Sequence, residues 1–233
     1  MYRKHIKRVL DFGMALAALS ILLPVLVLLS VIGLFAMKGN PFFFQSRPGK
    51  KDKNGKERIF RLVKFRTMSN ARDKEGNLLP DKVRLNSYGR FLRKTSLDEL
   101  PELWNILIGQ MSFVGPRPQL VRDMTFMTPE QRRRHDVRPG LTGLAQISGR
   151  NNVTWEQKFE YDLQYIDGGI TFAKDMKIIF RTVGKVISSS DVVREGTDSD
   201  MDFGDWLMEQ GRIDKKEYDE KQAQAKELLG VGR

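Results

Sequence analysis

The chain has 233 residues, no cysteine and two histidines, and its 40 lysines and arginines outnumber its 29 acidic residues. Without cysteine it has no disulfides, thiolate nucleophiles or cysteine-ligated zinc, and His5 and His135 lie too far apart in sequence to form a metal-ligand cluster. The formal charge of +11 favours anionic partners: nucleic acid, an acidic membrane surface or phosphorylated substrates.

An apolar segment without a charged residue runs from Phe12 to Met37. As a helix it would extend about 39 Å, which is enough for a bilayer core of about 30 Å. It is too long for the apolar core of a signal peptide, and no small-residue cleavage site follows it. The segment therefore predicts either a spanning helix or a re-entrant helix that enters and leaves by one leaflet.

Pro24 lies near the middle of this segment. Proline removes one backbone hydrogen bond and clashes with the preceding turn, so we expect the helix to break or kink there. The positive-inside rule puts both flanks on the cytoplasmic side, which favours the re-entrant form, although kinked spanning helices are also tolerated. The basic flanking residues are Arg3, Lys4, Lys7 and Arg8 before the segment and Lys38, Arg47, Lys50 and Lys51 after it.

The rest of the chain predicts an α+β, mainly helical globular domain with surface amphipathic helices and a short β-hairpin. The hairpin is expected from an apolar stretch at 41–45, a charged turn around Asn54-Gly55 and an alternating strand at 59–65. A polar loop at 71–82 follows. Apolar periodicity then predicts helices at 85–92, 100–108, 153–166 and 172–188, with a further helix starting at Pro129. The helix at 153–166 begins with a capping pattern, Thr154-x-x-Gln157.

We place the domain boundaries at 1–38 for the membrane anchor, 39–194 for the globular domain and 195–233 for an acidic C-terminal extension. The extension is expected to form one or two surface helices broken at Gly211. Its apolar residues are candidates for docking onto the domain: Trp206, Leu207, Ile213, Tyr218, Leu228 and Leu229.

Two adjacent carboxylates, Asp98 and Glu99, stand at the start of the helix expected at 100–108, and Arg117 follows between two prolines. Neighbouring acids do not suit a glycosidase, whose two carboxyl groups stand on opposite sides of the scissile bond. They suit a site where one carboxylate attacks phosphorus, the other holds a divalent metal and arginines bind phosphate oxygens. The structural alternative is a helix cap, because Ser96-x-x-Glu99 and Thr95-x-x-Asp98 both fit a capping box.

Five blocks together resemble one known family: LVKFRTM (62–68), LRKTSLDELPELWNIL (92–107), MSFVGPRP (111–118), RRRHDVRPGLTGLAQISGRN (132–151) and WEQKFEYDLQYID (155–167). In order and without large gaps, they resemble the bacterial sugar transferases called small monotopic phosphoglycosyl transferases. The resemblance extends from about Lys4 to Val193.

The resemblance implies an enzyme on the cytoplasmic face of the bacterial inner membrane, held by a re-entrant helix-break-helix. It implies transfer of a sugar-1-phosphate from a UDP-sugar to polyprenyl phosphate, such as undecaprenyl phosphate, with release of UMP. By the same resemblance Asp98 is the nucleophile, which forms a phosphoglycosyl-aspartate, and Glu99 is a ligand of the required Mg²⁺. The residues that match the family's phosphate site are Lys64, Arg93, Arg117 and Arg150. One departure is that Leu23, rather than the serine of several members, precedes Pro24.

Two other functions stay open for the same residues: a Mg²⁺-dependent phosphatase of polyprenyl diphosphates, and a non-catalytic membrane scaffold. Nucleic-acid binding would explain the charge, but no motif of that class is present and a hydrophobic anchor fits it poorly. The expected donor is a UDP-N-acetylamino sugar, since the chain lacks the extra membrane helices of the hexose-type relatives. Membrane lipids and downstream glycosyltransferases are further expected partners. His135 is expected to be a structural hydrogen-bonding residue, and Arg132–Arg134 membrane-surface or structural charges.

Overall fold

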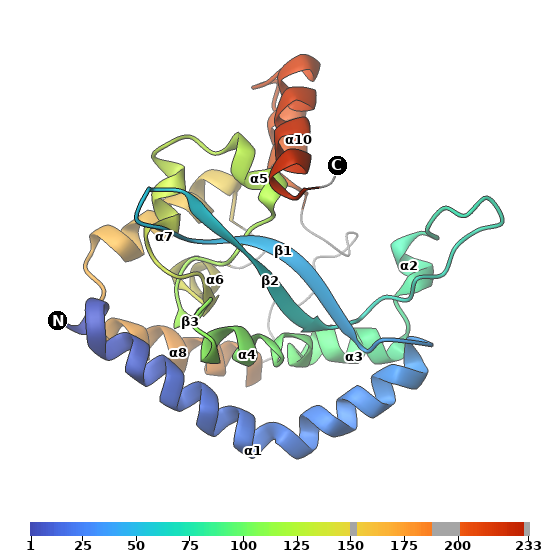
Figure 1. Ribbon diagram of the computed structural model, residues 1–233, viewed down its shortest axis with the longest axis horizontal. Coiled ribbons are helices and arrows are strands. Elements are labelled where there is room, and N and C mark those ends of the chain that lie inside the picture. Colours follow the sequence, from blue (N-terminus) through green and yellow to red (C-terminus); the bar gives the residue numbers. More distant parts are fainter. Residues whose placement is uncertain (150–152, 188–200, 231–233) are drawn as a thin grey trace.

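The computed structural model describes residues 1–149, 153–187 and 201–230. In these ranges the chain is mainly helical, with two small two-stranded sheets. Figure 1 shows the long helix α1 below the remaining elements, with α3, α4 and α8 at one level above it. The elements are the π-helical turn η1 (Tyr2–Ile6), α1 (Lys7–Ala36), β1 (Phe42–Lys51), β2 (Glu57–Phe65), α2 (Asp81–Arg84), α3 (Ser87–Thr95), the 3-10 turn η2 (Leu97–Glu99), α4 (Glu102–Leu107), β3 (Ser112–Val114), α5 (Val121–Phe126), the 3-10 turn η3 (Gln131–Asp136), β4 (Gly140–Thr142), α6 (Leu144–Ser148), α7 (Trp155–Asp167), α8 (Phe172–Ile187), α9 (Phe203–Glu209) and α10 (Lys215–Leu228).

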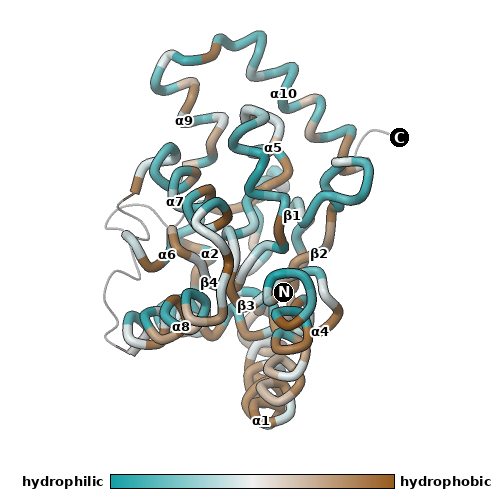
Figure 2. The backbone as a smooth tube through the Cα atoms, turned by 90° about the vertical axis from the view of Figure 1, so that its left-hand side faces the viewer, coloured by the Kyte–Doolittle hydropathy of each residue, from teal (hydrophilic) through white to brown (hydrophobic). Residues whose placement is uncertain are grey.

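Helix α1 is apolar and exposed, and it is long enough to cross a membrane. Its mean hydropathy reaches 2.8, and only 11% of its most apolar stretch is buried, so it is not a core helix of the domain. Pro24 lies inside the helix, and α1 is bent in its middle part (Figure 1), as the sequence predicts. Figure 2 shows α1 as a long hydrophobic stretch of the backbone beneath a more polar domain.

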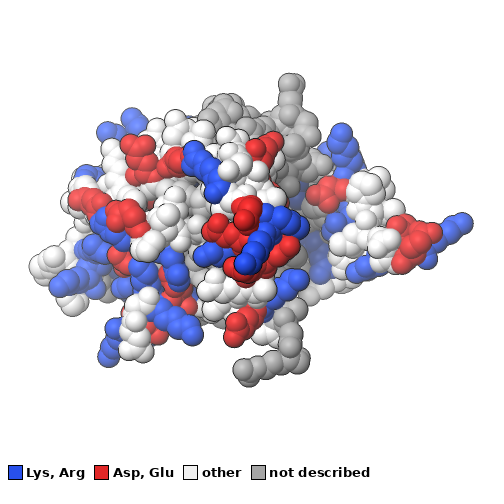
Figure 3. All heavy atoms as spheres, turned by 90° about the horizontal axis from the view of Figure 1, so that it is seen from above, with Lys and Arg blue, Asp and Glu red and all other residues white. Residues whose placement is uncertain are grey.

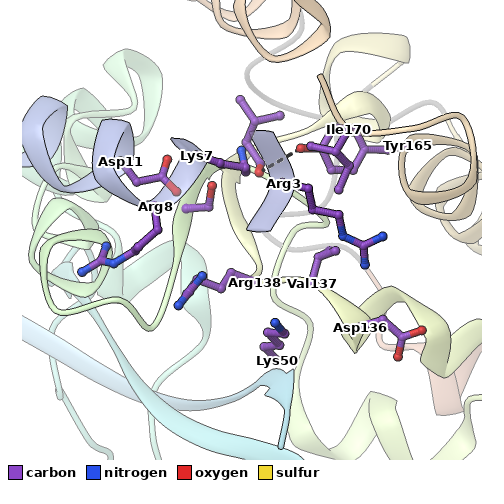
Figure 4. A pocket seen from close by; sticks show the side chains of 12 residues that line it. Arg3, Lys7, Arg8, Asp11, Lys50, Asp136, Val137, Arg138, Tyr165 and Ile170 are labelled. Atoms are coloured by element: carbon purple, nitrogen blue, oxygen red, sulfur yellow. Dashed lines mark hydrogen bonds between the residues drawn. The ribbon is translucent and has the colours of Figure 1, made fainter. Parts of the chain in front are cut away.

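Polar contacts hold the first turns of α1 to the domain. The Lys7 ammonium donates to the buried Asp175 carboxylate of α8 at 2.5 Å. That carboxylate also accepts hydrogen bonds from the hydroxyls of Tyr2 and Tyr165. Arg8 donates to the carbonyl oxygens of Ile106 and Leu107 at the end of α4. Figure 4 shows Lys7, Arg8 and Tyr165 around the small cavity at this end of the helix.

The other half of α1 is bonded to the same domain. The Tyr88 hydroxyl of α3 donates to the carbonyl oxygen of Leu29 at 2.8 Å, and the Asn86 amide donates to that of Ala36 at 2.8 Å. Leu29 also packs in a core cluster with Phe65 and Leu92. Both ends of α1 therefore contact one globular domain.

Strands β1 and β2 form the expected antiparallel hairpin, with strands longer than predicted. Asp52 accepts from two backbone amides in the turn, and Gly55 there has a φ of 76°, a conformation that glycine adopts without steric cost. The register pairs Phe43 with Lys64 and Arg47 with Phe60. Side chains alternate along a strand, so Phe43, Gln45 and Arg47 of β1 face the same side of the hairpin as Lys64.

A second sheet, which the sequence does not predict, joins β3 to β4 in parallel. Each strand is only three residues long, too short for a recognisable periodicity. A β-carbon at Gly140 would stand 2.1 Å from the Gly115 nitrogen, so only glycine allows these backbones to approach. The buried side chains of α7 and α8 pack against this sheet together with Val114.

The remaining helices agree with the sequence in part. Helix α7 begins with the predicted capping box between Thr154 and Gln157, and α8 coincides with the predicted helix. Phe172 and Val183 are exposed on this helix, whereas Ile178 is buried. The expected polar loop at 71–82 runs into the short helix α2, and the segment after Pro129 is the 3-10 turn η3 rather than an α-helix.

The described part of the C-terminal extension forms two helices, α9 and α10, with Gly211 between them, where one or two were expected. Phe203, Leu207, Trp206 and Ile213 pack in one cluster with side chains of α5 and α7, and the ring of Tyr218 lies 5.7 Å from that of Phe126. The expected docking of Leu228 and Leu229 is wrong, because both side chains are exposed at the end of α10.

We expect Asp175→Ala to lower the free energy of unfolding by about 3–5 kcal/mol, because the change leaves the Lys7 ammonium without its carboxylate in a largely buried site. Denaturant titration in detergent micelles measures this. Asp205→Ala removes an exposed acceptor of the Tyr218 hydroxyl and is the matched control, with an expected loss below about 1 kcal/mol. Equal losses in both variants would contradict the role assigned to Asp175.

Candidate active site

The two predicted acids lie in a tight turn between two helices. Helix α3 ends because Ser96 adopts a left-handed conformation with a φ of 55°, and Pro101 then begins α4. The Thr95 hydroxyl donates to a carbonyl within α3, and no side chain caps the turn that contains Asp98 and Glu99. The structural interpretation of this pair as a capping box is therefore wrong.

Glu99 instead joins two cations from different parts of the chain. Its Oε1 accepts from the Lys64 ammonium of β2 at 2.8 Å and from the Arg117 guanidinium at 2.7 Å. Burial by itself would raise the pKa of Glu99, but Arg117 and Lys64 hold that pKa well below its usual range. The carboxylate therefore stays ionised across physiological pH.

A third carboxyl, Glu102, belongs to the same cluster and was not singled out from the sequence. It is 2% exposed and lies 3.0 Å from the Lys64 ammonium. Burial raises the pKa of Glu102 to about 7, against the opposing effect of Lys64. The sequence could have identified Glu102 by its position three residues after Glu99, because that spacing places two side chains on one side of a helical turn.

Asp98 lines a cavity of about 550 Å³ together with Lys64, Arg93 and Arg117. Burial raises the pKa of Asp98 to about 6, and the negative charge of Glu99 adds to the rise, whereas the three cations oppose it. Asp98 is thus an ionised carboxylate at pH 7 that faces an open cavity beside three positive charges. This arrangement suits attack on an anionic substrate.

The cavity is walled by β1 and β2, α3, the loop after β3, α5, and the segments at Trp155 and Met201. Its other lining residues are Phe43, Gln45, Arg47, Leu62, Phe65, Arg66, Thr67, Met68, Asn70, Arg84, Glu102, Pro118, Gln119, Leu120, Arg122, Asp123, Trp155, Met201 and Asp202. Arg93 donates to the Thr67 hydroxyl and to the Met68 sulfur, which directs it along this wall. Of the predicted phosphate-site residues, three lie around one cavity, whereas Arg150 lies outside the described residues. Pro24 lies in α1 and does not line the cavity.

Buried contacts fix the loop that carries Arg117. The Arg134 guanidinium is 2% exposed, pairs with Asp162 at 2.6 Å and donates to the carbonyl oxygen of Arg117 at 2.7 Å. Pro116 and Pro118 restrict the backbone on either side. Arg134 is therefore a structural charge, one of the two roles expected from the sequence, and it acts by orienting Arg117.

His135 also has the structural role that the sequence predicts. It is buried, its ring lies 3.4 Å from Glu57, and burial lowers the pKa of His135 to about 4. It is neutral at physiological pH and does not line the catalytic cavity.

The carboxylates fit a magnesium ion that is shared with a substrate. Within the described ranges no group of three or more histidine, aspartate or glutamate side chains forms a ready-made metal site. Mg²⁺ does not need one, since it commonly binds one or two carboxylates, several waters and substrate phosphates. Both cations bond Oε1 of Glu99, which does not line the cavity. Asp98 and Glu102 line it, so these neighbouring carboxylates are the groups that could bind the ion together with substrate phosphates.

The face of the molecule that points away from α1 carries charges of both signs. Seen from the side of α10, acidic and basic side chains alternate over the surface (Figure 3). Among the described residues that this view shows, acidic side chains interrupt the basic ones, so the basic side chains form no continuous stripe.

Comparison with known proteins gives a consistent match. A family model described as "Bacterial sugar transferase" matches residues 2–189. The chain is 49% identical over 168 residues to the uncharacterized sugar transferase EpsL of Bacillus subtilis. The aligned segment covers 71% of this chain and 80% of that protein.

Two longer relatives carry names that state a reaction. The UDP-glucose:undecaprenyl-phosphate glucose-1-phosphate transferase of Klebsiella pneumoniae is 38% identical over 77% of this chain. The UDP-galactose-lipid carrier transferase of Erwinia amylovora is 33% identical over 79% of it. The match spans only 39% and 41% of these two proteins.

We expect Glu102→Gln to stabilise the protein at pH 7.5. A carboxyl whose pKa rises from 4.5 in the unfolded chain to about 7 on folding weakens the folded state increasingly as pH rises through this window, because the unfolded chain releases the proton first. Glutamine has no proton to lose, so the variant should melt about 2–5 °C higher than the original protein at pH 7.5.

The difference should shrink toward pH 4.5. Thermal unfolding in detergent at several pH values measures it, with Glu130→Gln as the control because Glu130 is exposed. A stability difference that does not change with pH would contradict the raised pKa of Glu102.

Proposed function

The chain belongs to the bacterial sugar transferase family and is a transferase, and on this premise we propose that it transfers a sugar-1-phosphate from a UDP-sugar to polyprenyl phosphate, with release of UMP. The observation that carries the proposal is the position of Asp98, an ionised carboxylate that faces the cavity between Lys64, Arg93 and Arg117. Both substrates are phosphate anions, and these cations provide the neutralisation that phosphoryl transfer needs.

In the first half of the proposed reaction, an Asp98 oxygen attacks the β-phosphorus of the UDP-sugar. A bond forms between that oxygen and phosphorus, the bond from phosphorus to the bridging oxygen breaks, and its electron pair leaves with UMP. The product is a phosphoglycosyl-aspartate. Arg117 is positioned to stabilise the negative charge of the phosphoryl oxygens, because Glu99 and the Arg134–Asp162 pair fix its side chain and its backbone.

In the second half, a phosphate oxygen of the polyprenyl phosphate attacks the same phosphorus. Polyprenyl-diphosphate-sugar forms and the Asp98 carboxylate is restored, so two large substrates use one site in turn. Mg²⁺, when bound, would neutralise phosphate charge and hold the diphosphate oxygens in line, with the carboxylates at the cavity as its protein ligands.

The membrane geometry that we propose is re-entrant, at the cytoplasmic face of the bacterial inner membrane. A helix whose two ends bond to one globular domain returns to the side from which it entered. The bend around Pro24 and the basic residues on both flanks agree with this geometry. It brings the cavity to the surface from which the lipid substrate is reached.

The donor that we propose is a UDP-N-acetylamino sugar. A panel of UDP-sugars with Mg²⁺ and undecaprenyl phosphate decides among donors directly.

We expect Asp98→Asn to reduce UMP release by at least about 10³-fold, because the amide is not a competent nucleophile toward phosphorus. UMP release with the panel measures this, and intact mass after donor alone should show an adduct on the unsubstituted protein only. A phosphatase of polyprenyl diphosphates would release inorganic phosphate instead of UMP. Substantial UMP release by Asp98→Asn would exclude Asp98 as the nucleophile.

Single cysteines test the membrane geometry, since the chain has none of its own. We expect Lys4→Cys and Asn40→Cys to react with a membrane-impermeant maleimide from the cytoplasmic side, in inverted vesicles but not in intact spheroplasts. Leu28→Cys, within the apolar helix, should be protected in both preparations. Labelling of the first two positions from opposite sides would replace the re-entrant helix by a spanning one.

A further inference from the structure

The catalytic cavity contains an arginine that neither the sequence motifs nor the proposed mechanism uses. Arg47 lies on β1, lines the cavity and donates to the carbonyl oxygen of Pro118 at 3.1 Å and to the Gln45 side chain at 2.6 Å. Its Nε is buried and has no hydrogen-bond partner. The side chain is thus held in a defined orientation with one donor unused.

Arg47 also differs from its neighbours in having no direct ion pair with an acid. Among the residues that the structure describes, Lys64, Arg117 and Arg122 each pair with a carboxylate in or beside the cavity, whereas no carboxylate oxygen lies within 4.0 Å of the Arg47 guanidinium. Burial lowers the pKa of Arg47 to about 10, and the positive charge of Arg117 lowers it further. Asp123, Glu102 and Asp202 oppose this lowering from a distance, but none of them forms an ion pair with Arg47. A half-buried cation without a direct partner favours an anionic ligand at the cavity wall.

The position of Arg47 separates it from the membrane side of the cavity. Arg93 belongs to α3, whose neighbouring side chains Leu92 and Tyr88 pack against α1. Arg47 lies at the other wall, where β1 contacts α5. In Figure 1, α3 stands directly above α1, and α5 stands on the far side of the hairpin. A lipid-linked acceptor approaches from α1, so the far wall is the one open to a soluble donor.

We propose that Arg47 binds the diphosphate of the nucleotide-sugar donor and is a donor-specific positioning residue. The inference rests on the proposed function and deepens it by separating the two phosphate substrates within one cavity. The guanidinium at the cavity wall, whose plane is fixed by Pro118 and Gln45, suits phosphate oxygens, which accept from arginine in defined directions. In the first half-reaction Arg47 would balance the charge that passes to UMP as the bond from phosphorus to the bridging oxygen breaks.

Binding of UDP and of uridine provides the first test, since the two ligands differ only in the phosphates. With Mg²⁺ present, we expect Arg47→Gln to weaken UDP binding about 10- to 100-fold, as the loss of a charge-assisted hydrogen bond does, and to change uridine binding less than twofold. Arg47→Lys should recover part of the loss, because it restores the charge without the planar geometry.

Arg61→Gln is the matched control. Arg61 lies on the same hairpin, is exposed and contacts the ring of Phe44 outside the cavity. The substitution therefore removes one positive charge from β2 without removing a contact to the donor. Its affinity for UDP should stay within twofold of the original protein.

Steady-state kinetics provides the second test, because in a ping-pong reaction each kcat/KM reports its own half-reaction. Arg47→Gln should lower kcat/KM for the UDP-sugar at least tenfold and leave kcat/KM for polyprenyl phosphate within twofold. Equal loss for both substrates, equal loss of UDP and uridine binding, or unchanged UDP binding would overturn the role of Arg47. Failure of the original protein to bind any UDP-sugar or UDP would instead overturn the proposed donor, and with it this inference.

Discussion

The Glu99 carboxylate, held between Lys64 and Arg117, is the contact on which the site depends. It joins three segments that are distant in sequence: strand β2, the turn between α3 and α4, and the loop after β3. Lys64 also pairs with Glu102, so displacing any of these groups would leave a partly buried charge without its partner. Arg117 and Lys64 keep Glu99 ionised, whereas burial raises the pKa of Glu102 to about 7 and that of Asp98, which faces the cavity, to about 6. Neighbouring acids with different roles thus follow from different partners.

Much of the fold could be predicted because its signals are local. The long apolar helix with its proline, the hairpin around Asn54-Gly55 and the capping box at Thr154 each depend on residues that are close in sequence. The parallel pair β3–β4 could not be predicted, because its partners are three-residue strands joined only by a long connection. Gly211 and the apolar residues around it predicted the C-terminal helices. Which of those apolar residues pack against the domain depends on α5 and α7, which are distant in sequence.

The residues of the candidate site likewise divide into those that local sequence predicts and those that it does not. Asp98, Glu99 and Arg117 stand in a motif that is visible in the sequence, and the structure places Asp98 and Arg117 around one cavity with Lys64 and Arg93. Glu99 does not line that cavity but bonds Arg117 and Lys64 beside it. Arg134 and Asp162 support this motif from 17 and more residues away, and nothing in their local sequence marks them as partners. Arg47 looked like one of many basic residues flanking the membrane segment. Its burial, its unused donor and its lack of a carboxylate appear only when β1 is packed against the loop at Pro118.

The contact between Lys7 and Asp175 also bears on the order in which the chain acquires its structure. The two residues are 168 positions apart, so at about 5–20 residues per second the ribosome needs about 10–30 s to deliver the partner of a lysine that emerges first. During this interval the apolar helix has only the bilayer to bury its surface. The anchor therefore enters the membrane before the contacts that fix its first turn exist, and the late-made helix α8 completes the attachment of the segment made earliest.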